Sequence, residues 1–349
     1  MLNPHRPPIW EPKTMCIEGG RRVSRRLVLA GGAAGIMLCA VPKGAASLDF
    51  PEPFIWRGQA MGAPAKIILY HPDRSTAKRL LGEASREAER LENIFSLYRS
   101  DSELTKLNRN GALASPSPDL VEVLRICHEC WQASDGLFDP TVQPLWNCLK
   151  KHFSQEHPSP DGPSQQLWNE ALAKVGFERV LFDENRIAFS KPSMSLTLNG
   201  IAQGYVTDRV TALFQREGVE HALVDMGEYR ALGSQPDGTA WRIGITDLEA
   251  GANVEEYVDI SGQALATSSF SGFQFEETGR FNHLLNPKTG FSAALYRWLT
   301  VIAPDAARAD AWATAFSLMD ENQIKAAIRG QTKMSVIAQK RSGQKLRVV

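Results

Sequence analysis

Hydrophobic and polar residues alternate with two different periods along this chain. Alternation at every second position is typical of a half-buried strand, and it predicts a strand or hairpin over residues 54–70, broken at Met61–Pro64. Several more strands are expected over residues 221–302, separated by turns rich in Gly and Asp. A further strand is expected over residues 194–198, where apolar and hydroxyl side chains alternate.

Other segments repeat their apolar residues at the helical period. Helices are predicted over 76–98, 119–134 and 206–214, and from a capping Asp305. Ser100 and Glu103 have the spacing of a capping box, which predicts another short helix at that point. Residues 151–164 are polar and rich in Pro and Ser, so they are expected to form a loop. Strands and helices without regular alternation indicate an α+β fold, a single large domain of mixed sheets with flanking helices.

A glycine turn, Gly200–Gly204, lies between an expected strand and an expected helix. The N-terminus of a helix offers free N–H groups and the positive end of the helix dipole, so a phosphate group fits there. The turn matches neither G-x-G-x-x-G nor a Walker loop, and a tight packing turn remains the alternative.

Two further segments carry residues suited to chemistry. Asp310 and Thr314 are four residues apart, hence on one face of the last strong helix, and their oxygen atoms suit a hard cation such as Mg²⁺. An exposed Asp, and a Thr bonded back along its helix, is the alternative. His283 precedes a turn and is either a general base or a structural residue.

Charge is unevenly distributed along the 349 residues, although Lys+Arg and Asp+Glu both total 39. The first 46 residues hold seven basic and two acidic side chains, which leaves 32 basic and 37 acidic residues in the remainder. The body therefore has a net charge of about −5, whereas nucleic-acid binding needs a basic surface. No nucleic-acid partner is expected.

The basic N-terminal segment has the pattern of an export signal. Arg25 and Arg26 precede an apolar run rich in Gly and Ala, and small residues lie just before Ser47. We interpret 1–46 as a twin-arginine signal peptide and 47–349 as the mature domain, exported to the periplasm. An ordinary signal peptide is the alternative.

The cysteines add little chemistry. Cys39 follows the bulky Leu38, which makes a lipid anchor an unlikely use of that residue. Cys127 and Cys130 form a C-x-x-C within an expected helix, with no second pair and no following His, so neither a zinc site nor haem attachment is expected. Buried thiols, or a disulfide between the two, remain open.

Several motifs in one order over about residues 55–335 resemble the bacterial FAD:protein FMN transferases, the ApbE-type flavin transferases. The motifs are Met61-Gly62, IFSLYRSDSELTKLN, SDGLFDPTVQPLW, LNGIAQGYVTDRV, ALVDMGEYRALG, HLLNPKTG and APDAARADAWATA. With its twin-arginine signal, the chain is also similar to the accessory flavin transferases of respiratory systems, including those beside nitrous oxide reductase.

The resemblance implies an ApbE-like fold and a Mg²⁺-dependent reaction. Members of the family move the FMN half of FAD to a Thr or Ser hydroxyl of a partner protein and release AMP; here the partner is expected to be a membrane respiratory or electron-transfer subunit. By resemblance, FAD is contacted by Met61, Tyr98, Leu137, Phe138, Asp139, Thr197, Gln203 and Leu284, and the metal by Gly200, Asp310, Ala313 and Thr314. By the same resemblance, His283 is the base and Gln203 a second catalytic group.

This chain departs from the common family pattern at its glycine turn, which usually reads Asp-Leu-Gly-Gly-Ile-Ala-Lys-Gly. Thr197, Asn199 and Gln203 replace the Asp, the first Gly and the Lys, and Glu228 stands in the common Gly-Gly-Asp. Gln203 can donate hydrogen bonds but carries no charge, so the metal must offset more of the phosphate charge. Two alternatives stay open: an FAD pyrophosphatase, and a non-enzymatic FAD-binding assembly factor for a respiratory complex.

Overall fold

The computed structural model describes residues 52–246, 254–329 and 333–349. The predicted signal peptide, 1–46, lies outside the described residues. Across the described ranges, none of the helices combines the length and the apolar character that a membrane span requires.

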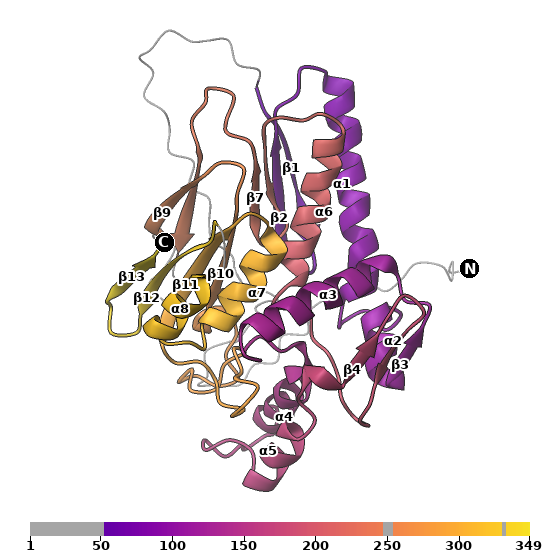
Figure 1. Cartoon of the computed structure of the whole chain (residues 1–349), viewed down its shortest axis with the longest axis vertical. Coiled ribbons are helices and arrows are strands. Elements are labelled where there is room, and N and C mark those ends of the chain that lie inside the picture. The colour runs from indigo at the N-terminus through magenta and orange to yellow at the C-terminus, as the bar shows by residue number, and fades with distance from the viewer. Residues whose placement is uncertain (1–51, 247–253, 330–332) are drawn as a thin grey trace, which may run out of the picture.

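An antiparallel sheet of eight strands forms the centre of the molecule (Figure 1), in the order β1-β2-β6-β7-β10-β11-β12-β13. These strands are β1 Phe54–Ala60, β2 Ala63–Leu69, β6 Ala222–Asp225, β7 Tyr229–Leu232, β10 Ala264–Ser269, β11 Tyr296–Ala303, β12 Ser335–Lys340 and β13 Lys345–Val348. Two small sheets accompany it: β3 Ala112–Ala114, β5 Arg186–Phe189 and β4 Val180–Phe182 form one, and β8 Trp241–Thr246 and β9 Val254–Ile260 the other.

Eight α-helices lie within the described residues. They are α1 Arg74–Phe95, α2 Glu103–Asn110, α3 Pro118–Ala133, α4 Gln143–Phe153, α5 Gln165–Leu172, α6 Ala202–Arg216, α7 Ala306–Phe316 and α8 Glu321–Ile328. Figure 1 shows α1 and α6 side by side along the sheet, with α4 and α5 beyond its lower end. The predicted α+β domain is confirmed.

The central sheet is buried on both faces. In β2, Ile67 and Leu69 belong to the large core shared with the helices, whereas Ile68 between them belongs to a second core that includes Trp241 and Ile243 of the β8–β9 hairpin. Successive strand side chains point to opposite faces, so the two cores follow from period two. The sheet is therefore the middle layer between the two cores.

The strand expected over residues 194–198 is wrong. Met194, Leu196 and Leu198 are buried as the alternation requires, but the segment joins no sheet. The side-chain amide of Asn108 substitutes for a neighbouring strand: it accepts from the Leu196 N–H at 2.7 Å and donates to the Leu196 carbonyl at 2.8 Å. On the other side the Thr197 N–H donates to the Pro140 carbonyl at 2.8 Å.

The long helix predicted over 76–98 runs instead from Arg74 to Phe95. The backbone turns to the extended conformation at Ser96, whose N–H still bonds to the Glu92 carbonyl. Tyr98 therefore lies in the following loop rather than on the apolar face of the helix, and 53% of its surface is exposed. In this loop the Tyr98 ring does not pack in the core and is available to contact a ligand.

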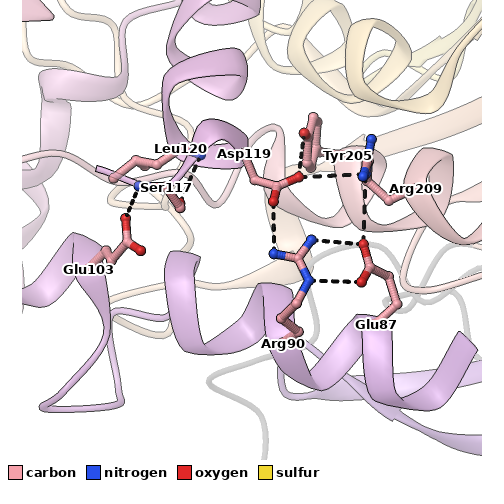
Figure 2. Close-up of polar contacts among 8 residues, drawn as sticks. All are labelled: Glu87, Arg90, Glu103, Ser117, Asp119, Leu120, Tyr205 and Arg209. Carbon is pink, nitrogen blue, oxygen red and sulfur yellow. Dashed lines mark hydrogen bonds and ion pairs between the residues drawn. The ribbon is translucent and has the colours of Figure 1, made fainter. Parts of the chain in front are cut away.

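The next helix, α2, is capped by Ser102 and not by Ser100, so the predicted capping box is wrong. The Ser102 hydroxyl accepts from the Thr105 N–H at 3.0 Å. Glu103 reaches across to α3 instead, where its carboxylate accepts from the Ser117 N–H at 2.9 Å (Figure 2). The predicted loop at 151–164 also begins later, because α4 continues to Phe153.

A network of charged side chains locks α1, α3 and α6 together (Figure 2). Arg90 of α1 bonds to Asp119 of α3 and to Glu87 of its own helix, both at 2.8 Å. Asp119 also accepts from the Tyr205 hydroxyl at 2.9 Å, and Arg209 lies 3.5 Å from the same oxygen. Burial acts to raise the pKa of Asp119, but the bonds from Arg90 and Tyr205 outweigh it and lower the pKa. Because Tyr205 belongs to the first turn of α6, the network fixes the helix that leaves the glycine turn.

Cys127 and Cys130 are free thiols buried in α3. Burial raises the pKa of both, that of Cys130 to about 12, so neither is a reactive thiolate at neutral pH. They are packing residues of the helix.

Candidate active site

The N-termini of α6 and α7 cap each other with carboxylates. Asp310 of α7 accepts from the Gly204 N–H in the first turn of α6 at 3.2 Å. Asp208 of α6 accepts from the Ala306 and Ala307 N–H groups in the first turn of α7, at 2.8 and 2.9 Å. Each carboxylate thus satisfies orphan donors at the positive end of the other helix. These reciprocal hydrogen bonds fix the position of the Asp310 carboxylate relative to the glycine turn.

Gly204 is required by this close approach. A Cβ atom built on it would lie 2.2 Å from the Ala306 carbonyl oxygen and 2.8 Å from the Ala307 Cα. Those are backbone atoms that cannot move aside. The second glycine of the turn is therefore explained by helix–helix contact.

A cavity of about 280 Å³ opens beside this pair of helix ends. We call it the deep cavity. All but one of the residues to which the sequence assigned a role line it: Met61, Tyr98, Leu137, Phe138, Asp139, Thr197, Gly200, Gln203, His283, Leu284, Asp310 and Thr314. Ala313 is buried on α7, and its carbonyl accepts from the Ser317 N–H and hydroxyl at 3.2 and 2.8 Å, so the structure does not bring it into the cavity lining.

Apolar side chains form part of the cavity wall. Phe138 and Leu284 are buried, and Met61 lies in the two-residue turn between β1 and β2. Met61 has φ of 50°, a left-handed conformation that a residue with a Cβ rarely adopts, followed by Gly62 at 76°. Such strain persists where the surroundings hold it, often at functional sites. The tight turn keeps the Met61 side chain at the cavity.

The Asp139 side chain is committed to the fold. Its carboxylate accepts from the Thr141 N–H and hydroxyl and, through the other oxygen, from the Phe177 N–H at 3.0 Å. Burial nevertheless raises its pKa to about 6. If Asp139 contacts a ligand, its main-chain groups make that contact, because its carboxylate is already occupied.

The oxygen atoms around Asp310 fit a hard divalent cation. One Asp310 oxygen is bonded to Gly204, and no protein donor is recorded for the other within the described residues. The Thr314 hydroxyl lies so near the glycine turn that a Cβ on Gly200 would come within 2.7 Å of it. A carboxylate, a hydroxyl and main-chain carbonyls are the ligands that Mg²⁺ prefers.

Glu228 adds a second buried carboxylate to the same cavity. It is 4% exposed, and its one recorded side-chain partner in the described structure is the Thr267 N–H at 3.2 Å. Burial and the nearby Asp310 charge raise its pKa well above the ordinary value, and burial also raises the pKa of Asp310, to about 7. Two buried carboxylates facing one cavity without a cationic side chain are expensive unless a positive ligand joins them.

The cavity lining is rich in carboxyl groups and poor in cationic side chains. Its carboxylates are Glu92, Asp139, Glu228 and Asp310. Arg99 is the one permanently cationic side chain among the described lining residues, and it pairs with Glu92 at 3.5 Å. An anionic ligand in this cavity therefore needs an accompanying cation.

Gln203 lies over the turn that carries Glu228. Gly227 has φ of 108°, and a Cβ on it would come within 2.4 Å of Gln203 Nε2. The amide thus lies against the turn that carries Glu228 and adds no charge to it.

His283 lines the cavity, and one of its two ring nitrogens is left to accept a proton. Its Nδ1 lies 3.0 Å from the Phe273 carbonyl, which can only accept, so Nδ1 carries the proton and Nε2 is unprotonated. Burial lowers the pKa of the ring below its ordinary value of 6.5, so the imidazole is neutral at pH 7. A neutral imidazole in the lining can accept a proton.

Sequence reasoning missed two residues of the site. The sequence showed Glu228 only as a departure from the common Gly-Gly-Asp. A carboxylate at a position that is usually glycine could have indicated a site residue. Asp208 carried no signal, because its partners Ala306 and Ala307 are remote in the chain.

Comparison with known proteins gives a consistent family. A family model described as "ApbE family" matches residues 61–338. The FAD:protein FMN transferase of Escherichia coli (strain K12) is 27% identical over 318 residues, covering 87% of this chain and 89% of that protein. The FAD:protein FMN transferase of Vibrio cholerae is 29% identical over 275 residues, covering 76% and 81% of the two chains.

Solved structures agree with the sequence matches. The flavin transferase ApbE from Vibrio cholerae superimposes with a TM-score of 0.73 at 25% identity, covering 85% of this chain and 96% of that one. The apo flavinyl transferase ApbE from Pseudomonas stutzeri gives a TM-score of 0.74 at 26% identity, covering 86% and 96%.

Proposed function

The chain belongs to the ApbE family, and we propose that it transfers the FMN half of FAD to a threonine or serine hydroxyl of a partner protein and releases AMP. The observation that carries the proposal is the deep cavity, where Asp310, Glu228 and the neutral ring of His283 share one lining with apolar side chains. Phosphoryl transfer from a bound dinucleotide needs three things: oxygen ligands that hold a cation, a general base, and an apolar wall.

Different residues of the cavity contact the flavin, the pyrophosphate and the metal. Met61, Phe138 and Leu284 provide apolar surface for the flavin, and the glycine turn at the start of α6 faces the pyrophosphate. Asp310, Thr314 and the Gly200 carbonyl would hold Mg²⁺. When bound, the cation supplies positive charge that offsets the phosphate oxygens.

The bond changes balance with a single proton. The acceptor hydroxyl oxygen bonds to the phosphorus on the FMN side, while the bond from that phosphorus to the bridging oxygen breaks and AMP leaves with that oxygen. His283 Nε2 takes the hydroxyl proton and passes it to solvent. Because Nδ1 is held by the Phe273 carbonyl, the ring keeps the tautomer that this step requires.

We propose that the protein acts in the periplasm after export by the twin-arginine route, on an electron-transfer subunit. The Arg25-Arg26 pair supports this proposal. Replacing the pair by Lys-Lys should leave the precursor in the cytoplasm; unchanged periplasmic recovery would point to the general secretory route.

The activity is tested by incubating the exported chain with FAD and Mg²⁺, with and without an acceptor protein. The proposal expects AMP release that depends on the acceptor, and flavin that stays on the acceptor after denaturation. AMP and free FMN appearing equally fast without acceptor would indicate a pyrophosphatase. Bound but intact FAD would indicate a binding protein.

A further inference from the structure

A second, more open hollow adjoins the deep cavity on the side of α2 and α4. It shares Leu97, Tyr98, Trp146 and Asn199 with the deep cavity and then runs along residues 193–195. We call it the basic cleft. Asn199 immediately precedes Gly200, so the cleft reaches the deep cavity at the glycine turn.

The cleft has the opposite charge to the cavity. Arg109 of α2 and Lys150 of α4 line it, both with exposed side chains, and its described lining contains no carboxylate. Neither cation is paired with a carboxylate in the described structure: Arg109 Nε has only the Asn110 side-chain oxygen at 3.4 Å, and Lys150 Nζ lies 5.0 Å from the centre of the Trp146 ring. Both charges are thus free to meet an anionic partner.

The rest of the cleft is suited to a polypeptide. The amide side chains of Asn108, Gln143, Asn147 and Asn199 line it, and amides can bond to both the N–H and the carbonyl of a peptide. Asn108 already bonds to both main-chain groups of Leu196, and Gln143 donates to Asn147 at 2.9 Å, so the Asn199 side chain and the remaining amide hydrogens are left for a ligand. The lining therefore offers donors, acceptors and two cations along one path.

FAD does not need the cleft. Of the residues assigned to FAD, only Tyr98, at the boundary, lines the cleft; the others line the deep cavity and not the cleft. The reaction has a second substrate, a protein segment whose hydroxyl must reach the phosphate at the glycine turn. The path that ends beside Asn199 leads to that point.

We propose that the basic cleft receives the acceptor protein as a segment with acidic residues flanking its reactive threonine or serine, positioned by Arg109 and Lys150. The inference rests on the proposed function and adds the chemistry of the acceptor. Because the two cations are exposed, each contributes modestly and its effect weakens with salt. They set which segment is chosen and how readily it binds, rather than the rate of the bond changes.

The test uses short randomised segments around a fixed threonine, fused to a carrier protein, with FAD and Mg²⁺ as co-substrates. Flavinylated products are sequenced by mass spectrometry. The full exported chain should enrich Asp and Glu beside the modified threonine. Lys150→Glu and Arg109→Glu should each reduce that enrichment by about fivefold to tenfold, more at low salt.

Lys151→Glu is the matched control. Lys150 and Lys151 are adjacent, both exposed, and both belong to the last turn of α4, so the two substitutions disturb the helix dipole alike. Only Lys150 lines the cleft. Lys151→Glu should leave the selected sequences and the dissociation constant of FAD unchanged.

Each other outcome decides against one proposal. Flavinylated segments without acidic enrichment, or with enrichment that Lys150→Glu leaves intact, overturn the inference while the transferase function stands. Lys150→Glu weakening FAD binding with unchanged selection also overturns it, because the cleft would then hold the nucleotide. FAD cleaved by the unaltered chain with no flavinylated segment at all counts against the proposed function itself.

Discussion

The deep cavity and the basic cleft meet at the glycine turn, yet they are built in opposite ways. The cavity lining carries Asp310 and Glu228 in buried positions, held by main-chain donors from Gly204 and Thr267. The cleft carries Arg109 and Lys150 on exposed side chains at helix ends. Buried charges fix one ligand and demand a compensating cation, whereas exposed charges select among partners at little cost to folding.

The difference separates chemistry from recognition. A substitution in the cavity should change the rate of transfer to every acceptor, and a substitution in the cleft should change which acceptor is used. Tyr98 lines both regions and should affect both. The following changes test this division, beginning with the largest expected effect.

Asp310→Asn should lower FMN transfer by about two or more orders of magnitude, the range for one preorganised electrostatic group. It removes a negative metal ligand but keeps an oxygen that can accept from the Gly204 N–H. Steady-state rates at saturating Mg²⁺ measure the loss. Thr314→Val should act in the same direction but less, since it removes a neutral ligand.

The same Asp310 variant also tests burial, because Asp310 is only 6% exposed. The exposed position that the sequence left open as the alternative for Asp310 is wrong. Removing a buried charge should leave the metal-free protein at least as stable as before, as measured by thermal unfolding in EDTA. A normal transfer rate for Asp310→Asn would remove this helix from the metal site.

His283→Gln should reduce transfer by about 100-fold, within the range for loss of a general base. Burial lowers the pKa of His283, so the unaltered ring stays neutral and active to below pH 6.5 and loses activity only in more acidic solution. The pH profile at saturating Mg²⁺ should show that acid limb, and the variant should lose it. An unchanged profile in the variant would assign the limb to another group.

Tyr98→Ala should raise the KM for both FAD and the acceptor by about threefold to tenfold, the worth of an aromatic contact of roughly 0.5–1.5 kcal/mol. Tyr98→Phe keeps the ring and should keep most of the affinity. If only one of the two KM values changes, Tyr98 contacts only one of the two ligands, and the two regions do not share it.

Gln203→Lys should have the smallest effect. It should reduce the difference in charge between the deep cavity and the basic cleft. A lysine over Gly227 would bring a positive charge to Glu228 and to the pyrophosphate. FAD binding in EDTA should then improve, by less than about tenfold because burying the ammonium offsets part of the gain. Fluorescence titration measures the change, and a weaker affinity than that of the unaltered chain would contradict it.

Much of this architecture was readable from the sequence. Apolar periodicity identified α1, α3 and α6, and the resemblance brought together residues that line one cavity although Met61 and Thr314 are remote in the chain. Asp305 caps α7 as its spacing predicted. Local rules were sufficient for these helices.

Two of the errors and one omission share a cause, which is that a distant partner decided a local structure. The amide of Asn108 replaced a strand beside Leu196, and Ser117 drew Glu103 away from a capping box. Asp208 caps a helix that begins almost a hundred residues later. The burial of Glu228 likewise depends on the packing of the sheet against α6 and α7, which no local pattern records.

The central claim is that a cation strengthens FAD binding in the deep cavity, since its lining sets four carboxyl groups against one paired guanidinium. Equilibrium dialysis of FAD against the exported chain, with Mg²⁺ and then with EDTA, measures this directly. The account predicts FAD binding in Mg²⁺ that weakens at least about tenfold in EDTA, equal to about 1.4 kcal/mol. Equal retention of FAD in both solutions would contradict it.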